Sequence, residues 1–108
     1  MNIKGMKPRV RQAYSFLREQ AKKQGKNICD LYEKKALVEY VNICDWDWSV
    51  HDEIAHGKTE EEALEATHEW FMKMSNEELF FDRISSHSQY ELILLKAEEL
   101  GFEPKEEV

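Results

Sequence analysis

Apolar residues recur at intervals of three and four along most of this chain, the spacing that lines one face of an α-helix. The spacing predicts five helices, over residues 7–24, 31–56, 60–74, 76–84 and 89–100. No segment alternates apolar and polar residues for long enough to predict a β-strand. The pattern therefore predicts an all-α fold, a compact single-domain bundle of about five helices.

Helix-terminal signals accompany these segments. A capping residue stands three positions before a glutamate in four places, a pattern in which each residue satisfies a free backbone amide of the other. The four patterns begin at Asp30, Thr59, Ser75 and Ser88. Pro8 suits the first turn of an opening helix, where its missing amide hydrogen is not needed. The expected helix stops are Gly25, Gly57 and Gly101, because glycine adopts the left-handed conformation that ends a helix.

The long second helix is expected to form an antiparallel hairpin with the third, around Gly57 and Lys58. Along it, apolar residues alternate steps of four and three, which is the heptad spacing of a packing seam. The seam consists of Leu37, Val41, Cys44, Trp48, His51 and Ala55. This pattern places the seam in the core of the bundle. The predicted core residues are Leu37, Val41, Cys44, Trp48, Leu64, Trp70, Phe71, Leu92 and Leu95.

His51 occupies one slot of that seam, and Asp47 lies one helical turn before it. Side chains four residues apart touch on a helix, and buried polar groups need partners. We therefore predict that Asp47 and His51 form a structural polar pair. The alternative is a metal site formed by Asp47, His51, Glu65 and His68, because the hairpin sets Asp47 opposite His68 and His51 opposite Leu64 or Glu65. These four side chains would supply a mixed oxygen and nitrogen ligand set. The structural pair is favoured, so we expect no cofactor and no metal.

Composition sets the broad class. The chain has 108 residues, of which 42% are hydrophobic, and this suffices for the core of one domain. It contains neither a run of about 18 apolar residues nor an apolar signal segment, so no membrane association is expected. If one helix runs between Cys29 and Cys44, they are about 22 Å apart, too far for a disulfide. Free thiols without an export signal indicate a cytoplasmic protein.

Charge divides the chain sharply. Residues 1–26 contain eight basic side chains and one glutamate, a net charge of +7. The other 82 residues contain seven basic and 21 acidic side chains, a net charge of −14. The expected organisation of the single domain, residues 1–108, is therefore a basic N-terminal helix segment (1–26), an acidic helical body (27–102) and a frayed tail (103–108). Either the basic segment packs against the acidic body and neutralises part of its charge, or the two segments present surfaces of opposite charge to partners.

Two features of the acidic body indicate an interaction surface. Trp46 lies opposite the predicted seam, on a helix face that should be polar, and exposed tryptophans anchor many interfaces. Glu61, Glu65 and Glu69 form a like-charge row at intervals of four, and only Lys73 answers it locally. Two other interpretations stay open: Trp46 is covered within the domain, and the row is simply solvated.

The sequence has no Gly-rich phosphate loop, no Cys-x-x-Cys pair and no nucleophile elbow, so we expect no enzyme. The leading prediction is a small non-enzymatic protein-binding module, acting as a regulator, adaptor or inhibitor. Its partner would be another protein with a basic patch, bound through Trp46 and the row Glu61, Glu65 and Glu69. A phage or other mobile element is a fitting source, and one subtype is a decoy that mimics nucleic acid.

The alternative prediction is nucleic-acid binding by the basic first helix, through Arg11, Arg18 and Lys22. The negative charge of the body opposes it, because a duplex would be repelled unless that helix projects clear. Nucleic acid is therefore the less favoured partner, and a homodimer stays open.

Overall fold

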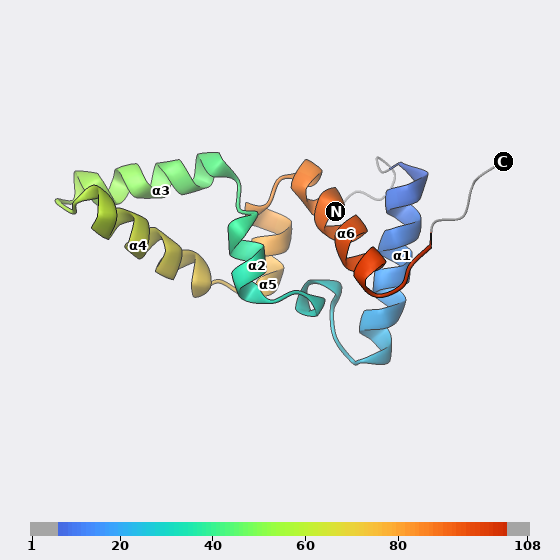
Figure 1. Cartoon of the computed structure of the whole chain (residues 1–108). Helices are drawn as coiled ribbons and strands as arrows, with labels where there is room; N and C mark the ends of the chain where they lie inside the picture. The colour runs from blue at the N-terminus through green and yellow to red at the C-terminus, as the bar shows by residue number, and fades with distance from the viewer. Residues whose placement is uncertain (1–6, 104–108) are drawn as a thin grey trace. The chain divides into compact units, whose positions relative to one another are not determined.

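The computed structural model describes residues 7–103, which form α-helices and no strand. The elements are α1 (Pro8–Lys23), a 3₁₀ turn η2 (Ile28–Leu31), α2 (Lys34–Glu39), α3 (Ile43–Ala55), α4 (Glu60–Met72), α5 (Asn76–Glu78), a π-helical turn η3 (Leu79–Arg83) and α6 (Ser86–Glu99) (Figure 1). The all-α prediction is therefore confirmed. Beyond Glu103, the tail that the sequence predicts to fray lies outside the described residues.

The chain divides into two compact units. The first comprises Met1–Tyr32 with Ser86–Val108, and the second comprises Glu33–Ser85. Within its described part, the first unit contains α1, η2 and α6, while the second contains α2, α3, α4, α5 and η3. A single domain over residues 1–108 stays a prediction.

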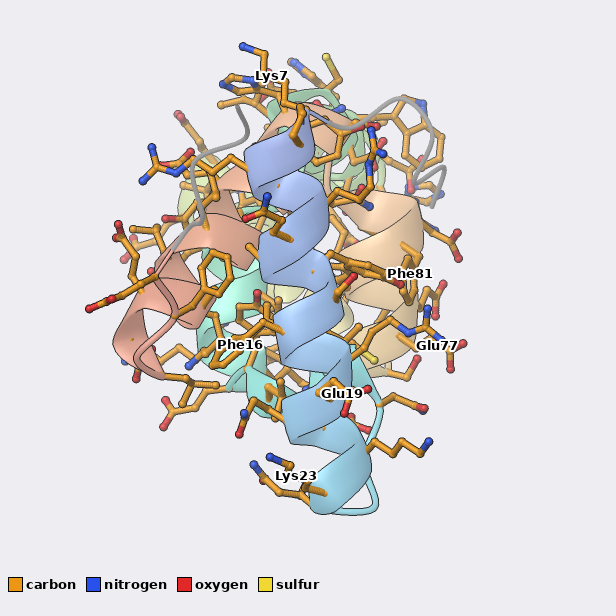
Figure 2. All side chains as sticks on the ribbon, turned by 90° about the vertical axis from the view of Figure 1, so that its right-hand side faces the viewer. Lys7, Phe16, Glu19, Lys23, Glu77 and Phe81 are labelled. Carbon is orange, nitrogen blue, oxygen red and sulfur yellow. The ribbon has the colours of Figure 1, made fainter. Side chains whose placement is uncertain are left out.

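In the first unit, α1 packs along α6 (Figure 1). The buried stripe of α1 repeats at intervals of three and four, and it consists of Val10, Ala13, Leu17 and Ala21. From α6 the core receives Leu92, Ile93 and Ala97. The Tyr32 hydroxyl donates a 2.8 Å hydrogen bond to the Leu92 carbonyl, and burial, with the nearby charge of Glu99, raises the pKa of Tyr32. Figure 2 looks onto α1, with the exposed Glu19 and Lys23 near its end.

In the second unit, α2 and η3 pack against each other, and α2 also packs on α4. Their buried residues are Leu37, Val38, Ala63, Thr67, Phe71, Leu79 and Phe80. The predicted hairpin is confirmed, since α3 and α4 lie side by side and run antiparallel (Figure 1).

Local chemistry explains the turn of this hairpin. Gly57 has φ of +95°, and the next amide, that of Lys58, donates to the Glu53 carbonyl at 3.3 Å. This closes α3 as expected for glycine in the left-handed region. The Thr59 hydroxyl then accepts from the Glu62 amide at 3.2 Å, and the Glu62 carboxylate accepts from the Thr59 amide. The Glu62 carboxylate also accepts from the Thr59 hydroxyl at 2.9 Å, and the two bonds that it accepts lower the pKa of Glu62.

The helix predicted over 31–56 is wrong, because the chain forms two helices there. Between α2 and α3 the Asn42 amide donates to the Arg83 carbonyl at 2.8 Å. The Asn42 side chain accepts from the Cys44 amide at 2.9 Å, so Asn42 is the N-cap of α3. A new cap and a bond to a residue 41 positions away thus replace the continuous helix.

Two other cap predictions are wrong. Asp30 lies inside the 3₁₀ turn η2, and Ser88 lies inside α6, which begins at Ser86. The Ser75 cap is confirmed, because its hydroxyl accepts from the Glu78 amide at 3.1 Å.

The predicted core is correct only in part. Leu37, Phe71 and Leu92 are buried, and Val41 is half-buried. The exposed members are Cys44, Trp48, Leu64, Trp70 and Leu95. The errors on α3 follow from its rotation about its own axis, which packing against α4 determines.

One buried polar contact contributes to that packing. The hydroxyls of Ser49 and Thr67 are hydrogen bonded at 3.1 Å, and both residues are buried. We predict that Ser49→Ala lowers the free energy of unfolding by about 1 kcal/mol, because the buried Thr67 hydroxyl loses its partner. Chemical denaturation measures this, with Ser15→Ala on the exposed side of α1 as the control for helix propensity. Equal stability of the two variants would contradict the prediction.

Candidate functional site

Trp46 fixes which side of α3 faces α4. Its ring stacks on Phe71, with centroids 5.2 Å apart and planes 21° apart. The rings of Trp46 and His68 are arranged edge to face, with centroids 6.4 Å apart. Trp46 is half-buried by this packing. The prediction that Trp46 lies outward as a binding anchor is therefore wrong, because the aromatic stack holds it between the two helices.

The part of the predicted seam that lies on α3 faces outward instead. Cys44, Trp48, His51 and Ala55 are all exposed, and 69% of Trp48 is accessible. These residues keep their spacing of four and three along one face. Trp46 and Ser49 face α4, and these four residues lie on the opposite side of α3, where they are exposed to solvent.

The predicted structural pair is also wrong. Asp47 and His51 are both exposed, and among residues 7–103 no hydrogen bond or ion pair joins them. Once the seam faces solvent, neither side chain needs a partner, because water satisfies both.

The alternative metal site finds no support in the same region. Glu65 and His68 are exposed on α4, and His68 packs its ring against Trp46. Among the described residues, no group of three or more histidine, cysteine or acidic side chains is arranged to hold a metal ion.

Seven of the eight exposed residues of α3 lie on one side of the helix, and we call this surface the α3 outer face. It consists of Ile43, Cys44, Asp47, Trp48, His51, Ile54 and Ala55. Asp47 is its single charged member, and Ile43 is 71% accessible. Sequence reasoning missed Ile43 and Ile54 because the predicted helix ran through residue 42 and placed the opposite side of this segment outward. Asn42 followed three residues later by Asp45 was the available signal for a new N-terminus.

Carboxylates border the α3 outer face on one side. Asp45 and Asp52 lie three residues before and four residues after Trp48, so they flank it on the same helix. Asp52 is exposed and Asp45 is half-buried.

The opposite border adjoins α4. Trp46 shares its flank of α3 with Ile43, three residues earlier, and His68 shares its flank of α4 with Leu64 and Glu61. Because the rings of Trp46 and His68 meet, these two flanks adjoin. Leu64 is 42% accessible there, and Glu61 is exposed beyond it.

Charge on the hairpin is strongly one-sided. Residues 43–72 contain nine acidic side chains and one lysine, a net charge of −8 with neutral histidines. The predicted row of Glu61, Glu65 and Glu69 is exposed along α4. The lysine, Lys58, pairs with Glu53 at 2.6 Å and also interacts electrostatically with Glu69, so one cation is shared among several carboxylates. Such a concentration of one sign attracts cationic surfaces.

A cation–π contact lies near the end of η3. The Arg83 guanidinium sits 5.2 Å from the centre of the Trp70 ring, and one of its nitrogens is 3.9 Å from the Glu78 carboxylate. The Arg83 Nε is buried and has no hydrogen-bond partner among residues 7–103. This contact covers part of Trp70, which is 40% accessible.

The basic residues of the alternative prediction lie on α1 in the first unit. Arg11, Arg18 and Lys22 are exposed and share one flank of the helix. Arg18 lies 5.9 Å from the centre of the Tyr14 ring, in cation–π contact. The structure brings these three residues onto one side of α1, as the spacing predicts.

Comparisons of the chain with protein-family models, curated proteins and solved structures found no match. Within residues 7–103, no helix has the length and apolarity needed to cross a membrane. Cys29 is buried, Cys44 is exposed, and both are free thiols.

The two neighbouring tryptophans of α3 give a matched test of its orientation. We predict that Trp46→Ala lowers the free energy of unfolding by roughly 2–3 kcal/mol, because it removes a half-buried ring stacked on Phe71. Trp48→Ala should change it by less than about 0.5 kcal/mol, since an exposed ring has little packing to lose. Thermal and chemical denaturation of both variants measure this. The reverse order of effects would mean that α3 is rotated the other way.

His56, which follows the last residue of α3, makes the stability of the folded chain depend on pH. Its Nδ1 lies 2.7 Å from the Asp52 carbonyl and 3.9 Å from the Asp52 carboxylate. The backbone hydrogen bond first, and then the carboxylate charge, raise the pKa of His56 above 6.5. A raised pKa means that the folded chain holds the proton more tightly than the unfolded chain. The stabilisation is thus complete below about pH 6.5 and is lost as pH rises through the folded pKa.

We predict that NMR titration of the His56 ring gives a midpoint above 6.5 and that Asp52→Asn lowers it, because the carboxylate charge is removed while the backbone carbonyl remains. Glu60→Gln, an exposed change across the turn, is the control. An unchanged midpoint in Asp52→Asn would show that the carboxylate has no effect on the ring.

Proposed function

We propose that this chain is a non-enzymatic protein-binding module whose α3–α4 hairpin binds a partner that carries a basic patch. One observation carries the proposal: the hairpin combines a net charge of −8 with large apolar side chains that are open to solvent. Exposed apolar groups within a polar rim are typical of protein interfaces, and one-sided charge speeds and orients the encounter.

The anchor in this proposal is Trp48 rather than Trp46. Trp46 is committed to the stack on Phe71, whereas Trp48 is 69% accessible. Tryptophan is enriched among the interface residues that contribute most to affinity, because its large ring is buried on binding. The row of Glu61, Glu65 and Glu69 keeps the role that the sequence suggests, which is attraction of basic side chains.

The biological role that fits is that of a regulator, adaptor or inhibitor in the cytoplasm. Two free thiols agree with a reducing compartment. One form of this role is a decoy whose carboxylates replace phosphates on the basic site of a nucleic-acid-binding protein. No resident cofactor or metal is part of the proposal.

Nucleic-acid binding remains the second candidate. The observation that favours it is the exposed flank of α1 with Arg11, Arg18 and Lys22. Basic side chains on one helix face are the usual contacts to phosphates. The second unit weighs against it, because its five basic and fourteen acidic residues give it a net charge of −9.

The proposed function predicts that neutralising the acidic row weakens partner capture. The immobilised chain should retain a basic protein from an extract of the organism that encodes it, as measured by quantitative mass spectrometry. The triple change of Glu61, Glu65 and Glu69 to glutamine should reduce the retained amount at least tenfold at low salt, because three charge contacts are lost. The control is the triple change of Glu19, Glu91 and Glu103 to glutamine, which alters net charge equally on exposed positions outside the hairpin.

A gel-shift assay with single-stranded and duplex DNA and RNA separates the two candidates. The proposal expects no retarded complex at low salt. A complex that disappears when Arg11, Arg18 and Lys22 are changed to glutamine would contradict the proposal and favour nucleic-acid binding.

A further inference from the structure

The α3 outer face has the geometry of an unpaired helix–helix interface. Cys44, Trp48, His51 and Ala55 are separated by steps of four, three and four residues, and all are exposed. This is the spacing at which the side chains of one helix fit between those of another. Ile43 and Ile54 widen the stripe on the side that adjoins Leu64 of α4.

The carboxylates around this face favour a partner helix with basic flanking residues. Asp45 and Asp52 border the stripe beside Trp48, and Glu61 borders it beyond Leu64. A helix lying on the stripe would therefore place its flanking residues beside carboxylates on both sides. Lysine or arginine in the flanking positions would pair with them, as charged flanking residues do in coiled coils. Asp47, inside the face, adds to the same preference.

The same charges disfavour a second copy of this chain. Two hairpins facing each other would bring net charges of −8 and −8 together, and like charges across an interface repel. An anionic membrane surface is disfavoured for the same reason. A neutral apolar helix would leave the bordering carboxylates without partners.

We propose that the α3 outer face is the docking site for a basic amphipathic helix of the partner protein, which lies along α3 with its apolar stripe centred on Trp48. From Ile43 to Ala55 the face is about 18 Å long, which matches about 12 residues of a partner helix. This inference rests on the proposed function and names the partner's binding element. Binding to the acidic row requires only basic residues on the partner. Binding to the α3 outer face also requires that the partner's helix carries apolar residues at heptad spacing.

The probe for this inference is a synthetic 15-residue peptide with leucine at heptad positions a and d and lysine at most others. A scrambled peptide of identical composition keeps the charge and removes the apolar face. Fluorescence anisotropy of each labelled peptide with the full chain measures binding at several salt concentrations. We expect the patterned peptide to bind at least tenfold more tightly than the scrambled one, and binding to weaken as salt rises.

Variants of the chain locate the site. Trp48→Ala and Ile43→Ser should each weaken binding of the patterned peptide at least fivefold, while Leu95→Ser, a matched change of a 48% accessible leucine on α6, should have no effect. Because these side chains are exposed, the variants should fold, and circular dichroism checks this. In ¹⁵N spectra the shifted amides should lie in residues 43–55. Equal binding of both peptides, or full binding by Trp48→Ala, would overturn the inference.

The failures of the two proposals are distinguishable. If partner capture is lost with the three glutamates of α4 but persists in Trp48→Ala, the protein-binding function stands and the helix-docking inference fails. If the wild-type chain sediments as a dimer that Trp48→Ala dissociates, the face binds a second copy and the inference is overturned. Binding of the chain to phosphatidylserine vesicles, lost in Trp48→Ala, would overturn it in favour of a membrane surface.

Discussion

The rotation of α3 about its own axis is the constraint on which the surface of the second unit depends. Two contacts with α4 determine it: the stack of Trp46 on Phe71 and the hydrogen bond between Ser49 and Thr67. Both direct the same side of α3 inward, since residues 46 and 49 are three apart. The residues on the opposite side of α3, Trp48 included, are exposed to solvent.

Because of this rotation, side chains whose spacing is typical of a buried seam are exposed to solvent. In a buried seam, Cys44, Trp48 and Ala55 would contribute to stability. On an exposed face they contribute little to folding and become available to a partner. In the proposed function, the acidic residues that border the stripe disfavour self-association of this face and favour cationic partners. The hairpin thus combines exposed apolar side chains with a strongly negative charge.

The turn between α3 and α4 is held by local hydrogen bonds. Gly57 ends α3 through backbone bonds, and Thr59 and Glu62 begin α4 through reciprocal hydrogen bonds. The other end is held differently, because the bond from the Asn42 amide to the Arg83 carbonyl joins the start of α3 to the end of η3. The position of α3 therefore depends on a contact within the unit between residues far apart in sequence.

The sequence by itself determined the all-α class, the α3–α4 hairpin, the glycine stops and the caps at Thr59 and Ser75. These features depend on residues three to five positions apart, and such interactions can be read from spacing. Tertiary structure decided the break at Asn42, the inward side of α3 and the exposure of Trp48 and His51. The reason is that α3 has apolar residues on more than one side, so its own pattern allows two rotations. The partners that select between them, Phe71 and Thr67, lie 25 and 18 residues away from Trp46 and Ser49.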